Sequence, residues 1–184
     1  MPISGFYDTG VLRQAATNLF CGWGYNFYRV ENQLCADDQL VRSRAAELLG
    51  LAKASVRQAE AEYRRKFLPS PARAKPFPDH AAIEAAQQLE GLARGIGALE
   101  ALIQEQPVPE NDRMTQRYRQ EAPTLKALIH YDEQLVGQCE LLRSVVSGQD
   151  GASILTKFPD LEGGLEAIRA TLLSREAVLL DRAL

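Results

Sequence analysis

Four residues with side chains suited to metal binding or acid–base chemistry fall on or beside the apolar seams of the amphipathic segments. They are Asp38, Glu121, His130 and Asp132. A buried carboxylate is costly unless it is paired. These residues therefore indicate either a polar layer that fixes helix register, with an Arg or His as partner, or a metal site inside a bundle. Exposure to solvent is the third interpretation.

The spacing of the possible ligands argues against the metal interpretation. Carboxylate-bridged metal sites in helical bundles use Glu-x-x-His on two helices, and neither His130 nor His80 has that spacing. The three cysteines, Cys21, Cys35 and Cys139, form no C-x-x-C pair and match no zinc or iron–sulfur pattern. No nucleophile triad, phosphate loop or dinucleotide fingerprint occurs. We predict no metal and no cofactor, and we lean towards a protein that is not an enzyme.

Aromatic residues are concentrated at the N-terminus, where seven of the thirteen lie within the first 28 residues. One interpretation is an aromatic plug that closes one end of the bundle, because aromatic rings bury large areas. The other is a recognition surface, because Tyr and Trp are enriched at binding hot spots. Glycines on both sides of Trp23 would let a partner's backbone approach closely. The second interpretation predicts these partner-binding residues: Tyr7, Trp23, Tyr25, Phe27 and Tyr28.

A basic run spans residues 64–75 and contains no acidic residue. Its members are Arg64, Arg65, Lys66, Arg73 and Lys75. Cations at the end of a helix interact favourably with the helix dipole, which is one account of the run. The other is a docking site for phosphate, nucleic acid or an acidic partner. Nucleic acid is the less favoured partner, because only Phe67 and Phe77 could stack on bases.

The elements that must position these residues are helices. Strong helix formers dominate and alternating strand patterns are nearly absent. The sequence predicts an all-α fold, an antiparallel up-down bundle of about four long helices with a short N-terminal helix packed on it. Residues 1–184 form a single domain. We expect the short helix at 9–21, long helices at about 26–67, 79–105, 112–147 and 159–182, and a proline-rich connection at 69–78.

Several residues predict where these helices begin, bend and end. Asp79 is placed to cap the second long helix, and Pro159 suits the first position of the last one. Pro123 lies inside the third long helix, but the apolar seam keeps its phase through the proline. We therefore expect one kinked helix there rather than two helices. A short helical turn is expected at 152–156.

The function predicted from these patterns is a non-enzymatic, helical protein-interaction module: an adaptor, an assembly factor or a chaperone-like bundle. The partner is expected to be another protein, and a homodimer fits as well. One alternative is a metal-binding or enzymatic bundle that uses the seam carboxylates, and another is an anion or nucleic-acid binder that uses the basic run. The N-terminus shows no signal sequence and no apolar run is long enough to span a bilayer. We therefore expect a cytoplasmic, prokaryotic protein with no membrane partner.

Overall fold

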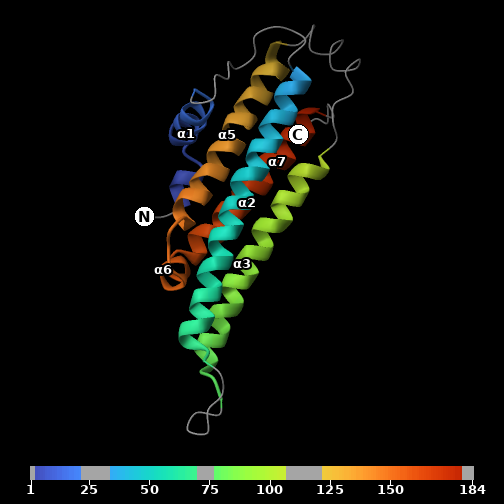
Figure 1. The fold of residues 1–184 in the computed structure, drawn as a ribbon. Coiled ribbons are helices and arrows are strands. Elements are labelled where there is room, and N and C mark those ends of the chain that lie inside the picture. The colour runs from blue at the N-terminus through green and yellow to red at the C-terminus, as the bar shows by residue number, and fades with distance from the viewer. Residues whose placement is uncertain (1–2, 22–33, 70–76, 107–121, 180–184) are drawn as a thin grey trace.

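The computed structural model describes residues 3–21, 34–69, 77–106 and 122–179. Every regular element in these ranges is a helix, which confirms the predicted all-α bundle (Figure 1). The elements are the 3-10 helix η1 (Ile3–Phe6) and the α-helices α1 (Thr9–Cys21), α2 (Leu34–Phe67), α3 (His80–Glu105), α5 (Ala122–Val146), α6 (Gly151–Thr156) and α7 (Phe158–Leu179).

Four long helices, α2, α3, α5 and α7, lie side by side and form the body of the molecule (Figure 1). Helix α2 packs against both α3 and α5, α5 also packs against α7, and α3 contacts α7. Figure 1 shows α2 and α3 running in opposite directions, and likewise α5 and α7. Helix α1 lies on the outer side of α5, so α5 is covered by three helices.

The apolar seams read from the sequence form the core of the bundle. In α2 the seam positions from Val41 to Ala59 are buried, and in α5 the positions from Leu128 to Val146 are buried. The residues of α3 and α7 that face them include Leu89, Ile96 and Ile168. Residues that recur every three or four positions share one face of a helix. That spacing explains why a single stripe on each helix supplies the core.

Side-chain caps and turns set the ends of several helices. Asp79 Oδ1 accepts a hydrogen bond from the Ala81 amide at 3.2 Å, as expected for the cap of α3. Asp150 Oδ1 accepts one from the Ser153 amide at 2.9 Å and caps α6. Gly148 has φ +67°, a left-handed conformation that suits the turn after α5. A single residue separates α6 from α7, whose second residue is Pro159.

Parts of four predicted segments lie outside the described residues. They are the start of the helix expected from residue 26, most of the proline-rich connection, the first ten residues of the helix expected from residue 112, and residues 180–182 of the helix expected at 159–182. Pro123 is the second residue of α5 as described. The predicted kink at Pro123 depends on residues before 122, so it remains a prediction.

None of the helices in the described ranges is both long enough and apolar enough to cross a membrane.

Candidate functional site

Close packing of α1 on α5 creates the most distinctive surface of the molecule, and Gly137 makes that packing possible. A Cβ at position 137 would lie 2.4 Å from the carbonyl oxygen of Leu12 and 2.8 Å from its Cα. Only a residue without a side chain allows the α1 backbone to come this near. Leu12 itself is fully buried. Helix α1 is therefore seated on α5 at one fixed position.

Polar contacts and one aromatic ring hold the N-terminal segment to the bundle. The side-chain amide of Gln138 donates a hydrogen bond to the Phe6 carbonyl at 3.0 Å, and both residues are buried. The Phe6 ring packs over Gly164 of α7, where a Cβ would lie 2.6 Å from the ring. At the surface, Arg13 Nε lies 3.5 Å from Glu133 Oε2. These contacts orient α1 along its length.

An open groove of about 380 Å³ runs between α1 and α5, and we refer to it as the α1–α5 groove. Aliphatic side chains supply most of its lining, and polar groups stand among them. The lining residues are Val11, Leu12, Ala15, Asn18, Leu19, Gly137, Glu140, Leu141 and Ser144. Val11 is 49% exposed although it is aliphatic. The groove therefore offers solvent an apolar surface with hydrogen-bonding groups beside it.

The predicted aromatic recognition residues are only partly placed by the structure. Tyr7 is 59% exposed and lies just before α1. Trp23, Tyr25, Phe27 and Tyr28 fall outside the described residues, so the choice between plug and recognition surface stays open for them.

Asp132 forms a buried ion pair with Arg175. Its Oδ1 accepts a hydrogen bond from Arg175 Nε at 2.6 Å, and neither side chain is more than 3% exposed. Asp132 belongs to α5 and Arg175 to α7, so the pair joins two neighbouring core helices. A charge pair desolvated in this way is a polar contact between helices, the arrangement that a polar layer requires.

Of the other three residues proposed for a polar layer or metal site, only His130 has a side chain that the structure describes. His130 is exposed, and its ring contacts that of Tyr131 with centroids 5.7 Å apart. Asp38 lies in α2 with its side chain outside the description, and Glu121 lies outside the described residues. The described part of the chain contains no group of three or more His, Cys, Asp or Glu that could hold a metal ion.

Cys139 is a buried free thiol on the core side of α5. Desolvation by burial, helped by the charge of Glu140, raises the pKa of this thiol far above its ordinary value. A neutral thiol is a poor nucleophile and a poor metal ligand. Cys139 is therefore a packing residue. The side chains of Cys21 and Cys35 lie outside the description.

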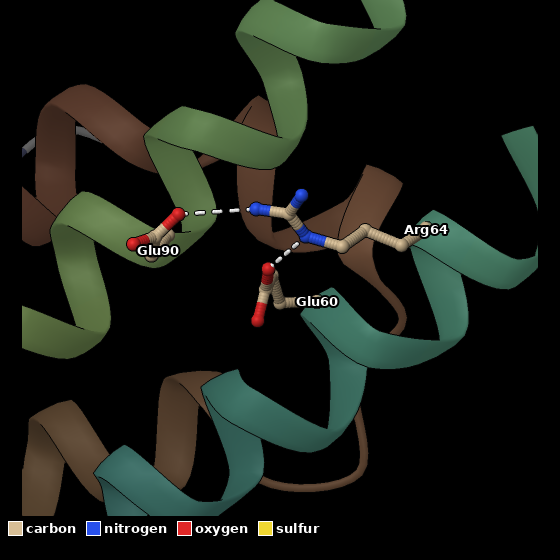
Figure 2. A network of polar contacts seen from close by, with 3 residues as sticks. All are labelled: Glu60, Arg64 and Glu90. Carbon is tan, nitrogen blue, oxygen red and sulfur yellow. Dashed lines mark hydrogen bonds and ion pairs between the residues drawn. The ribbon is translucent and has the colours of Figure 1, made fainter. Parts of the chain in front are cut away.

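One cation of the basic run bridges two helices at the surface, and Figure 2 shows how. Arg64 of α2 forms an ion pair with Glu60 one turn earlier, and its Nη2 lies 3.0 Å from Glu90 Oε2 of α3. The hydrogen bond with Glu60 raises the pKa of Arg64 above its usual value. Arg64 thus links α2 to α3, whereas Arg65 and Lys66 are exposed. Arg73 and Lys75 lie outside the described residues.

Sequence reasoning missed Arg175 and the residues of the α1–α5 groove. A signal for Arg175 existed, because it falls in the seven-residue gap between Leu172 and Leu179 on the last seam. The groove had no comparable signal, since Val11 and Leu141 look like ordinary members of amphipathic helices. Comparisons with protein-family models, curated proteins and solved structures find no match to this chain.

Proposed function

We propose that this protein is a non-enzymatic protein-interaction module, of the adaptor, assembly-factor or chaperone-like kind. The proposal rests on the α1–α5 groove, a largely apolar surface left open on the outside of the bundle. Exposed apolar surface of this kind is typical of interaction sites. The groove has the form that accepts the apolar face of a partner helix, with contacts every three or four residues.

The partner that fits best is an amphipathic helix of another protein. Aliphatic contacts from Val11, Leu19 and Leu141 would supply affinity. Asn18 Oδ1 already accepts a hydrogen bond from Gln14 and Ser144 Oγ already donates one to the Leu141 carbonyl, so the Asn18 amide N–H and the Ser144 lone pairs would orient the partner. Glu140 is already engaged by Arg143 at 2.5 and 2.7 Å. The alternative of a seam-carboxylate metal site is less favoured, because Asp132 is committed to Arg175 at 2.6 Å.

The proposed location is the cytoplasm of a prokaryote. The chain has three cysteines, too few for a disulfide framework, and Cys139 is a buried thiol in its reduced form. Proteins with this use of cysteine are typical of reducing compartments.

The test is quantitative capture of binding partners by the full chain and by two matched variants. Val11→Glu places a charge in the α1–α5 groove, and Leu51→Glu places the same charge on the outside of α2. Val11 is 49% and Leu51 51% exposed, so neither change should disturb the core. We expect Val11→Glu to weaken binding of the captured partner by more than about tenfold. The change removes one aliphatic contact and places a charge that the complex would have to desolvate.

The partner found in this way is then purified and its affinity is measured with the wild type and both variants. Melting temperatures of the variants should match the wild type. Equal losses of affinity in Val11→Glu and Leu51→Glu, or no loss in either, would contradict the proposal.

A further inference from the structure

A second surface, separate from the α1–α5 groove, lies at the end of the molecule where α2 ends and α3 begins. We define the basic tip by Arg65, Lys66 and Phe67 at the end of α2 and Phe77 just before α3. Figure 1 places this end of the α2–α3 hairpin at the bottom of the view, away from α1. The tip is the convex end of an elongated bundle.

The charge of the chain is strongly uneven about this tip. Residues 63–78 contain five Lys and Arg and no Asp or Glu. The whole chain has a net charge of −3, so the rest of it carries −8, the difference between −3 and +5. Positive charge gathered in one short stretch of an otherwise acidic chain favours attraction to anionic surfaces.

The cations of the tip are available for such an attraction. Arg65 and Lys66 are exposed and form no ion pair with any residue in the described ranges, in contrast to Arg64. Glu62 lies one turn before these cations, and Asp79 and Asp150, also near the tip, accept backbone N–H groups as helix caps. The pKa of Asp150 is lowered by its hydrogen bonds with Ser153 and also by the charge of Lys66. Arg65 and Lys66 both remain exposed to solvent.

Phe77 adds an apolar group that simple charge attraction does not require. Its side chain is 81% exposed, more than any other large hydrophobic residue in the described chain. Phe67 is already in contact with Tyr63, at 4.5 Å between ring centroids, and with Lys66 Nζ at 5.1 Å. One free ring is not a stacking platform for single-stranded nucleic acid, which needs successive aromatic faces along a groove.

Although the sequence alone predicts no membrane partner, we propose that the basic tip docks the protein on an anionic lipid surface, with Arg65 and Lys66 at the headgroups and Phe77 inserted at the acyl boundary. Binding of this type combines buried apolar area with attraction to anionic lipids, and each Lys or Arg near the surface contributes separately. The anionic leaflet faces the cytoplasm. The tip would thus hold the bundle end-on at a membrane and leave the α1–α5 groove open to a partner.

The test is co-sedimentation of the full chain with lipid vesicles. One set of vesicles is pure phosphatidylcholine and the other is phosphatidylcholine mixed with phosphatidylglycerol. We expect binding to the anionic vesicles only, and a steep loss of binding as salt is raised. Arg65→Gln with Lys66→Gln should weaken this partitioning by more than about tenfold. Phe77→Ala should weaken it by about tenfold while the salt dependence stays unchanged.

The matched control is Arg57→Gln with Arg94→Gln, which removes the same charge from exposed positions within α2 and α3. It should bind the anionic vesicles like the wild type, and all variants should keep the helical circular dichroism of the wild type. Equal loss in the control pair would show a nonspecific charge effect and overturn the proposal. The proposal would also be overturned if the wild type did not bind the anionic vesicles but bound polyglutamate or a single-stranded oligonucleotide through the same residues.

Discussion

Gly137 and Gly91 are both helical glycines, but their surroundings differ completely. A Cβ at 137 would collide with the backbone of Leu12, whereas a Cβ at 91 would meet no atom within 4 Å. Alanine is favoured over glycine inside a helix by about 1 kcal/mol when nothing else changes. The two positions therefore separate the cost of close packing from intrinsic helix propensity.

Gly137→Ala should lower the free energy of unfolding by about 1–3 kcal/mol, because the backbones of α1 and α5 must move apart. Gly91→Ala should raise it by up to about 1 kcal/mol. Chemical denaturation monitored by circular dichroism measures both changes. Stabilisation by the alanine at 137 would mean that α1 does not pack on α5 as closely as the contact with Leu12 indicates.

The roles of Gly137 and Arg175 illustrate what the sequence does not reveal at the residue scale. A glycine on a seam is compatible with a bend, a weak point or a close approach, and only the neighbouring helix distinguishes them. A charged residue in the gap of a seam has the same pattern whether it is exposed or paired. The pairing of Arg175 with Asp132 depends on the rotation of α7 against α5, which no single-helix pattern contains.

At the scale of elements, the Asp132–Arg175 pair joins α5 to α7 in the core of the bundle. Burial removes both charges from water, so their attraction mainly offsets a large desolvation cost. The pair favours one register of α7 along α5, because a shifted helix would leave an unpaired charge in the core. Its contribution is specificity of packing rather than stability.

Asp132→Leu alone should lower the free energy of unfolding by about 3–5 kcal/mol, because it removes the carboxylate that Arg175 Nε contacts at 2.6 Å in a desolvated site. Combining it with Arg175→Met should recover most of that loss, since both buried charges are then gone. Glu166→Gln, which breaks the exposed pair with Arg169, serves as the control and should cost less than about 1 kcal/mol. A double variant as unstable as the single one would show that the pair is net stabilising.

Helix positions were the most predictable feature at this scale. The apolar period of residues 79–105 predicts a helix over that range. Helix α3 spans His80 to Glu105, and Asp79 is its N-cap. Such seams carry strong signals because one side of the helix must be apolar over many turns. The α1–α5 groove could not be predicted, because it depends on how far two helices stand apart and not on the face each presents.

For the whole molecule, α1 is the most weakly integrated of the longer helices. It packs mainly on α5 and on η1, whereas α5 itself is covered by α1, α2 and α7. A helix of this length has little stability alone. We therefore expect α1 to separate from α5 in a local opening that leaves the four long helices folded.

Native-state hydrogen exchange should show this hierarchy. We expect the amides of α1 to exchange at a lower free energy than those in the middle of α2 and α5, because α1 loses its contacts in a local opening. Gly137→Ala should speed exchange in α1 far more than in α3. Equal protection of α1 and α5 would indicate one cooperative unit and rule out independent opening.

The contact between Leu12 and Gly137 also has a consequence for synthesis of the chain. The two residues are separated by about 125 positions, and a ribosome adds roughly 5–20 residues per second. At that rate, the part of α5 on which α1 packs is synthesised some 6–25 s after α1 itself. Through that interval the apolar face of α1 lacks the α5 surface that covers it in the folded protein, so it is exposed to chaperones that bind nascent chains.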